Sequence, residues 1–214
     1  VTAIKEILKS WKSDVPYRSI DREALQNVSG SKENIITPDK ANAVFLAGLS
    51  FEMNENDAPS TALQIGNFIL GGGTLSSRLG DRIRQKEGLS YGVTSAVSIP
   101  SRGNDARFTI NAITNPGNMD AVEKAAFEEL KRFIADGPTE QELADAQKAF
   151  IESEKVSRTG DSSIAVQLIS NLHLDRTFAY TADREKRVLA LKTADIKDAF
   201  KKYVEKEKLP VLRA

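Results

Sequence analysis

Residues 44–51, with the sequence Val-Phe-Leu-Ala-Gly-Leu-Ser-Phe, constrain the fold of this chain more than any other segment. If the segment is extended, apolar side chains occupy both of its faces, because they stand at alternate and at neighbouring positions alike. A strand with two apolar faces belongs inside a sheet rather than at its edge. We therefore expect a sheet of several strands with residues 44–51 in its interior.

The elements around this strand follow a mixed order of strands, two helices, strands, a run of helices and a final strand. Apolar residues at helical spacing predict helices at residues 2–13, 59–70, 74–86, 162–173, 177–191 and 194–206. Another helix ends near Gly137, and the next one begins at a capping box formed by Thr139 and Glu142. This order predicts an α+β fold, with helices packed on one face of a largely antiparallel sheet.

Two segments of alternating residues predict neighbouring strands in the middle of the chain. Tyr91, Val93, Ser95 and Val97 are expected to share one face of the first strand. The second strand covers residues 107–112, where Phe, Ile and Ala alternate with polar side chains.

The chain is predicted to be one domain with an N-terminal extension. Residues 1–33 form a helix and a linker from the preceding region, and residues 34–214 form the body, which begins with a short strand at 34–36. Residues 209–214 resemble the beginning of a strand, and the first residue is a valine rather than a methionine. We therefore expect the chain to be a piece of a longer protein, from which a signal peptide could have been lost.

The composition is that of a soluble globular protein and excludes several classes of function. Hydrophobic residues make up 40% of the chain, and 30 basic residues balance 30 acidic ones, so the overall charge does not favour nucleic-acid binding. No apolar run reaches the roughly 18 residues that suggest a transmembrane segment. The absence of cysteine excludes disulfides, thiolate nucleophiles and cysteine-based zinc sites.

Neither a metal site nor a cofactor site is predicted in this chain. His173 is the single histidine, which makes a histidine-rich zinc site or a Ser-His-Asp triad improbable and favours a surface side chain. Gly71, Gly72 and Gly73 precede a predicted helix, as a phosphate-binding loop would, but the spacing of the known phosphate-binding motifs is missing. A sharp turn between two helices is the favoured interpretation of these glycines.

Arg84 and Tyr91 are the candidate functional residues, and they stand seven positions apart across the glycine at 88. A guanidinium and a phenol can both donate hydrogen bonds to a carbonyl oxygen that gains negative charge during acyl transfer. The chain offers no nucleophile, base or metal cluster to accompany them, which suggests half of an active site. The alternative is that Arg84 belongs, with Arg78, Arg82 and Lys86, to a solvated helix face.

The residues around these two positions resemble a known family. Residues 76–79, Ser-Ser-Arg-Leu, and residues 83–93, Ile-Arg-Gln-Lys-Glu-Gly-Leu-Ser-Tyr-Gly-Val, are similar to the C-terminal, non-zinc half of the pitrilysin/insulinase zinc metallopeptidases. The resemblance is greatest to bacterial processing-peptidase-like members. It extends from about residue 34 to the end of the chain, and the segment from Arg84 to Tyr91 is its specific part.

The resemblance implies a division of labour between two homologous halves that face each other across a cavity. The partner half holds the zinc, on the same polypeptide or on a second subunit, whereas this chain carries no cofactor and is inactive alone. Arg84 would bind a backbone carbonyl of a peptide substrate, and Tyr91 would orient the substrate and stabilise the oxyanion.

The resemblance leaves function and location open. The alternative to half of a peptidase is a non-catalytic structural or interaction domain of the same fold, like the core subunits of respiratory complexes. The resemblance to bacterial members favours a periplasmic location, and a cytoplasmic one is compatible with the sequence.

Overall fold

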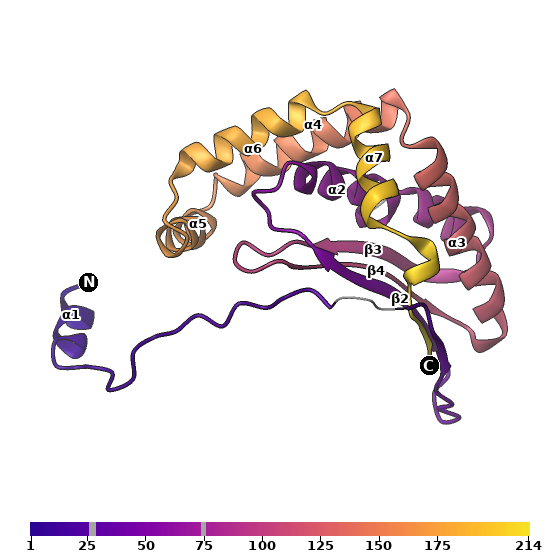
Figure 1. Ribbon diagram of the computed structural model, residues 1–214, viewed down its shortest axis with the longest axis horizontal. Helices are drawn as coiled ribbons and strands as arrows, with labels where there is room; N and C mark the ends of the chain where they lie inside the picture. The colour runs from indigo at the N-terminus through magenta and orange to yellow at the C-terminus, as the bar shows by residue number, and fades with distance from the viewer. Residues whose placement is uncertain (26–28, 74–75) are drawn as a thin grey trace.

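A five-stranded mixed sheet organises the chain in the computed structural model, which describes residues 1–25, 29–73 and 76–214 (Figure 1). The strands lie in the order β1–β5–β2–β4–β3, and their bounds are Lys32–Asn34 (β1), Ala43–Glu52 (β2), Ser90–Ser98 (β3), Asp105–Thr114 (β4) and Val211–Arg213 (β5). β2 is antiparallel to both β4 and β5, β3 is antiparallel to β4, and β1 is parallel to β5. The interior position predicted for residues 44–51 is confirmed.

Helices make up most of the remaining chain. The α-helices are Thr2–Leu8 (α1), Pro59–Asn67 (α2), Met119–Asp136 (α3), Glu140–Ser157 (α4), Asp161–His173 (α5), Phe178–Ala190 (α6) and Thr193–Tyr203 (α7). The described residues also form two π-helical segments, Phe68–Gly72 (η1) and Gly80–Lys86 (η2), and two 3₁₀ turns, Pro116–Asn118 (η3) and Lys206–Lys208 (η4). No helix among the described residues is long and apolar enough to cross a membrane.

The helices are layered on one face of the sheet. α2 and α3 contact the strands directly, α7 packs against both of these helices, and α4 and α6 form an outer layer over α2 (Figure 1). The predicted α+β fold, with helices on one face of a largely antiparallel sheet, is therefore confirmed. The opposite face of the sheet is not covered by these helices.

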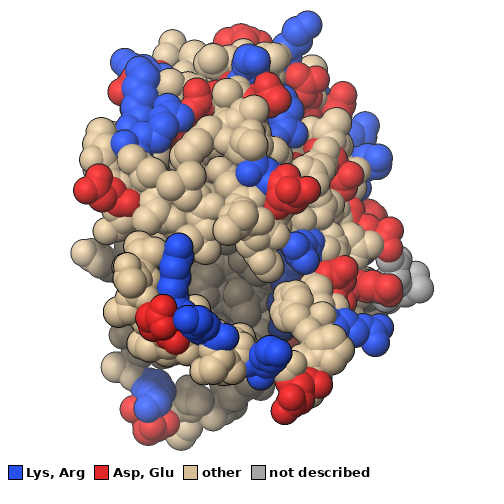
Figure 2. All heavy atoms as spheres, turned by 90° about the vertical axis from the view of Figure 1, so that its left-hand side faces the viewer, with Lys and Arg blue, Asp and Glu red and all other residues tan. Residues whose placement is uncertain are grey.

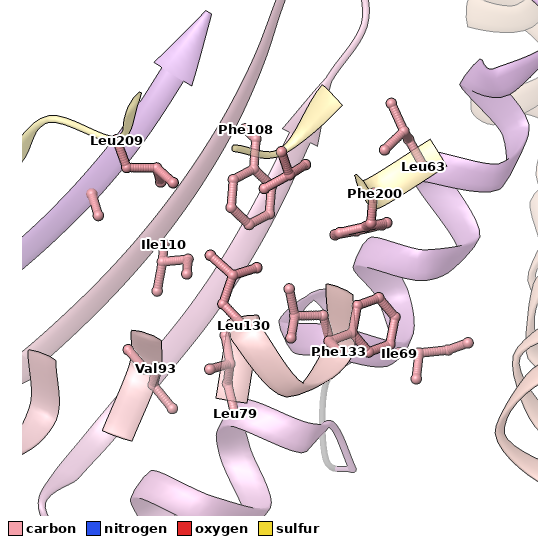
Figure 3. Close-up of a cluster of buried hydrophobic side chains, with 14 of the residues drawn as sticks. Leu63, Ile69, Leu79, Val93, Phe108, Ile110, Leu130, Phe133, Phe200 and Leu209 are labelled. Atoms are coloured by element: carbon pink, nitrogen blue, oxygen red, sulfur yellow. The ribbon is translucent and has the colours of Figure 1, made fainter. Parts of the chain in front are cut away.

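The hydrophobic core lies between the sheet and this helical layer. Phe108 from β4 meets Phe200 from α7, which also packs edge-on against Phe133 from α3, with ring centroids 4.9 Å apart (Figure 3). All three rings are fully buried. Close approach of α2 to α7 depends on Gly66, because a Cβ there would lie 2.5 Å from the Phe200 ring.

The N-terminal extension leaves the body of the molecule. α1 ends at Leu8, whereas the sequence predicts a helix to residue 13, and none of its residues is buried. An isolated helix of this length is marginal in water, and α1 has no buried side chain whose packing would stabilise further turns. Nearer the body, Asn104 donates its backbone N–H to the carbonyl of Arg22, so the extension touches the β3–β4 hairpin at this point. The division at residue 33 stays a prediction.

The structure also changes the type or bounds of other predicted elements. The helix predicted at 59–70 is α-helical only to Asn67 and continues as η1, and the helix predicted at 74–86 is π-helical from Gly80. Residues 74 and 75 lie outside the described residues. The strand predicted at 34–36 runs instead over Lys32–Asn34, where the backbone pairs with β5.

Candidate functional site

A tight turn joins η2 to β3 and sets the positions of both candidate residues. The backbone N–H of Leu89 donates to the carbonyl of Ile83 at 2.9 Å, which folds the chain back directly after the helix. Gly88 has a φ of +61°, a conformation that costs any residue with a Cβ roughly 1–2 kcal/mol. The glycine at this position is therefore explained by the turn itself.

Tyr91 lies on a β-bulge at the start of β3. Ser90 pairs with Thr114 and Gly92 pairs with Ile113, so Tyr91 is an extra residue without a partner on β4. The extra residue reverses the alternation, and the Tyr91 side chain is 95% exposed whereas Val93 is buried. The prediction that Tyr91 shares a face with Val93, Ser95 and Val97 is wrong for this reason.

Arg84 lies in η2, on the helical side of the same turn. Its side chain is half-buried, and its Nη2 lies 3.8 Å from the place that a Cβ on Gly80 would occupy, so the guanidinium reaches back along its own helix. η2 packs against β3, which places Arg84 and Tyr91 on contacting elements. The structure thus brings the two residues into one region, with Tyr91 projecting further into solvent.

Two of the neighbouring arginines have structural partners. Arg78 donates from Nε and Nη2 to the two carboxylate oxygens of Glu142, both at 2.7 Å, and its guanidinium lies over the Phe133 ring. Arg82 forms ion pairs with Glu87 and Glu128 on the surface. The basic side chains therefore do not form a uniform solvated face, because Arg78, which lies just before η2, contacts Phe133 of α3 and Glu142 of α4.

Glu142 has two roles. The predicted capping box is present, since the Glu142 amide donates to the Thr139 hydroxyl and the Thr139 amide donates to the Glu142 carboxylate at 2.7 Å. The pKa of Glu142 is lowered from 4.5 to about 2, chiefly because the Arg78 guanidinium hydrogen-bonds the charged form; hydrogen bonds from Thr139 act in the same direction, and together these effects exceed the opposing effect of burial.

The lowered pKa makes stability depend on pH in a defined direction. Because the folded pKa of Glu142 lies below the unfolded one, its contribution is complete above about pH 4.5 and is lost as the pH falls towards 2. We expect Glu142→Gln to lower the free energy of unfolding at pH 7 by about 1–2 kcal/mol, less than the full shift implies because the pair is partly solvated. The measurement is chemical denaturation of both proteins from pH 7 to pH 2.

The control for this prediction removes a nearby carboxylate, that of Glu140, for which the described residues show no arginine partner. Glu140 lies in the same first turn of α4, and its carboxylate accepts a hydrogen bond from the Thr193 hydroxyl. Glu140→Gln should leave the steep loss of stability below pH 4.5 intact, whereas Glu142→Gln should flatten it. Parallel curves for Glu142→Gln and the unmodified chain would contradict the assignment.

The three glycines at 71–73 are explained by packing. Gly71 and Gly72 lie within η1 and Gly73 follows it. A Cβ on Gly71 would lie 2.6 Å from the backbone nitrogen of Ser95, so only glycine allows η1 to approach β3 this closely. This close approach supports the structural interpretation of the glycines over a phosphate-binding one.

Among the described residues, no group of three or more histidine, aspartate and glutamate side chains could hold a metal ion. His173 is exposed at the end of α5, and its backbone carbonyl accepts a hydrogen bond from Arg102. Its position agrees with the surface role predicted for it.

Two large surface clefts lie away from the candidate residues. One, of about 610 Å³, is lined by α4, α5 and α6, and the other, of about 780 Å³, lies beside the end of β2 and the end of α7. Neither is lined by Arg84 or Tyr91. These two clefts are therefore separate from the candidate residues.

Arg84 and Tyr91 stay predicted site residues, whereas the bulge at Tyr91 and the buried residues beside it were not predicted from the sequence. Ser90 and Thr114, which pair across β3 and β4 beside Tyr91, are buried polar residues. The one available signal was the run of Ser90, Tyr91 and Gly92 at the start of a strand, since glycine in a strand often accompanies a bulge.

Comparison with known proteins shows the family to which the chain belongs. A family model described as "Peptidase M16 inactive domain" matches residues 1–150. A curated protein of Helicobacter pylori named "Non-peptidase homolog YmxG" is 26% identical over 175 residues, which are 81% of this chain and 39% of that protein.

Solved structures share the fold over nearly the whole chain. A peptidase M16 inactive domain from Pseudomonas fluorescens superposes with a TM-score of 0.80 at 24% identity, covering 95% of this chain and 47% of that one. A protease from Helicobacter pylori gives a TM-score of 0.83 at 16% identity, covering 98% and 50%. The chain thus spans about two fifths of the curated relative and about half of these two solved chains.

Proposed function

The chain belongs to the family of M16 peptidase inactive domains, and from this we propose that it is the metal-free half of a two-half zinc endopeptidase. In this proposal a homologous half, on the same polypeptide or on a second subunit, holds the zinc. The present chain binds the peptide substrate and donates hydrogen bonds to the reacting carbonyl. The chain alone does not hydrolyse peptides.

The exposure of Tyr91 is the observation that carries the proposal. A tyrosine ring is a large apolar surface that is usually at least partly buried. The bulge that turns this ring outward leaves one residue of β3 unpaired and disrupts the regular pairing with β4 at that point. The cost is understandable if the phenol has a partner outside this chain. Bulges that re-aim a side chain are frequent beside active sites.

The chemistry assigned to the two residues is donation to a developing negative charge. Zinc bound in the partner half would supply an activated water. The Tyr91 hydroxyl donates to the carbonyl oxygen as this oxygen becomes an oxyanion, and the Arg84 guanidinium donates to a backbone carbonyl of the same peptide. These donors stabilise the transition state more than the substrate, because the charge is greater there.

Several surface features support a large partner. The helices α1 and α5 have no buried residue, and their exposed apolar side chains include Ile4, Ile7, Ile169 and Leu172. The side of the molecule on which α5 and the N-terminus lie is hollowed, and several lysine and arginine side chains lie at the edge of the hollow together with acidic ones (Figure 2). Apolar side chains that are exposed together on a surface often mark a site of contact with another protein.

Reconstitution tests the proposal. The chain would be mixed with a family half that contains the His-x-x-Glu-His zinc motif, and cleavage of an internally quenched, unstructured peptide would be followed. We expect cleavage by the mixture and none by this chain alone. A mixture that binds the peptide but cleaves it no faster than the zinc-bearing half alone would overturn the proposal.

A second candidate function is favoured by one comparison. The curated relative from Helicobacter pylori is named a non-peptidase homolog. Under this second function the present chain would be a structural or interaction domain, and Tyr91 would be a contact residue. The two functions are separated by turnover: a non-catalytic domain forms the complex with its partner without accelerating cleavage.

A further inference from the structure

The backbone on both sides of Tyr91 is fastened to β4 by buried hydroxyl groups. The Ser90 hydroxyl lies 2.6 Å from the carbonyl oxygen of Ile113 and 2.9 Å from that of Gly92, so it can donate to either. The Thr114 hydroxyl donates to the carbonyl oxygen of Leu89 at 2.5 Å. Ser90 and Thr114 are both buried. Carbonyls before and after Tyr91 thus have fixed partners.

These hydroxyls provide hydrogen-bond partners for backbone carbonyls on both sides of the bulge, and the Asn118 side-chain amide also donates to the Leu89 carbonyl at 3.4 Å. A bulge leaves carbonyls without their normal partners, and a buried carbonyl without a hydrogen bond is costly. With regular pairing and simple alternation, Tyr91 would point to the same face as Val93 and Ser95, which are buried under the helices. The hydroxyls therefore stabilise the arrangement in which Tyr91 points away from the core.

We propose that Ser90 and Thr114 are positioning residues that hold Tyr91 on the outward side of β3, ready to reach a peptide substrate at the zinc site of the partner half. The catalytic consequence rests on the function proposed above, whereas the structural part concerns this chain alone. Neither hydroxyl touches the substrate; both act through the backbone of the bulge.

Matched variants separate this role from a general effect on folding. Ser90→Ala and Thr114→Val each remove one hydroxyl at nearly constant volume, whereas Thr114→Ser keeps it. Ser95→Ala is the control, because Ser95 lies on the same strand and is equally buried, and its hydroxyl has no hydrogen-bond partner among the described residues. If the proposal is correct, Thr114→Ser and Ser95→Ala behave like the unmodified chain.

The first readout is amide hydrogen exchange of this chain alone, measured by NMR. Losing one hydrogen bond should accelerate exchange of the protected amides in residues 90–93 and 113–114 by about fivefold or more, while amides of α3 keep their protection. We expect this result for Ser90→Ala and Thr114→Val. Unchanged exchange at the bulge, or equal acceleration in Ser95→Ala, would overturn the structural part.

The second readout is the kinetics of the reconstituted enzyme. Displacing Tyr91 should lower kcat by about ten- to a hundredfold, the range for misplaced catalytic groups, with KM and the affinity between the halves unchanged. In a Tyr91→Phe background the same substitutions should have no further effect, because the hydroxyls act through the phenol. Additive losses in that background would overturn the positioning role.

The two proposals fail in different ways. If the unmodified chain and the zinc-bearing half do not cleave peptide, the proposed function fails, and the exchange experiment alone decides whether the hydroxyls hold the bulge. If the unmodified pair is active and Ser90→Ala and Thr114→Val leave kcat unchanged, the positioning role fails and the proposed function stands.

Discussion

Tyr91→Phe should lower kcat of the reconstituted enzyme by about ten- to a thousand-fold, the range expected when one oxyanion donor is lost. Phenylalanine keeps the ring and removes only the hydroxyl, so contacts made by the ring persist. Because the lost hydrogen bond strengthens as charge develops, kcat should fall while KM changes little. The measurement is steady-state cleavage of the unstructured peptide at saturating partner concentration.

The control for this substitution is another exposed tyrosine. Tyr17 lies on the N-terminal extension and is 80% exposed, and Tyr17→Phe should leave kcat unchanged. If Tyr91→Phe turns over peptide at the unmodified rate, Tyr91 is a contact residue and the non-catalytic function gains support. A rise in KM alone would assign Tyr91 to substrate binding instead.

Phe200→Ala should destabilise the fold by about 3–5 kcal/mol, the cost of deleting a fully buried aromatic ring. The ring joins the helical layer to the sheet, because it packs edge-on against Phe133 of α3 and Phe108 of β4. The cavity left behind cannot collapse easily, since the rigid elements α2, α3 and β4 surround it. The measurement is the free energy of unfolding from chemical denaturation at neutral pH.

A second phenylalanine provides the matched control. Phe178, the first residue of α6, is 42% exposed, and Phe178→Ala should cost less than about 1.5 kcal/mol because less surface leaves water on folding. A loss of similar size in both variants would contradict the central position assigned to Phe200. The comparison depends on the difference between two variants, which is more reliable than either value alone.

The elements that local sequence determines were predicted well. The capping box of Thr139 and Glu142 involves residues three positions apart, and it is found as predicted. The interior position of β2 followed from its own apolar residues, which needed no knowledge of the strands beside it. Neighbouring residues alone carry the necessary physical information in both cases.

The bulge at Tyr91 could not be predicted in the same way. It depends on how β3 pairs with β4, and in particular on Ser90 and Thr114, which are far apart in the sequence. Alternation alone would have placed the Tyr91 side chain on the buried face. The second role of Glu142, as the partner of Arg78, was missed for the same reason, because the two residues meet only through tertiary packing.

The most direct test of the account is the distance between Tyr91 and the metal of the partner half. With cobalt(II) in place of zinc and carbon-13 in the tyrosine rings of this chain, paramagnetic broadening in the assembled pair reports that distance. We predict strong broadening of the Tyr91 signal, with the signals of Tyr180 and Tyr203 unaffected. A Tyr91 signal as sharp with cobalt as with zinc would contradict the claim that this residue faces the metal site.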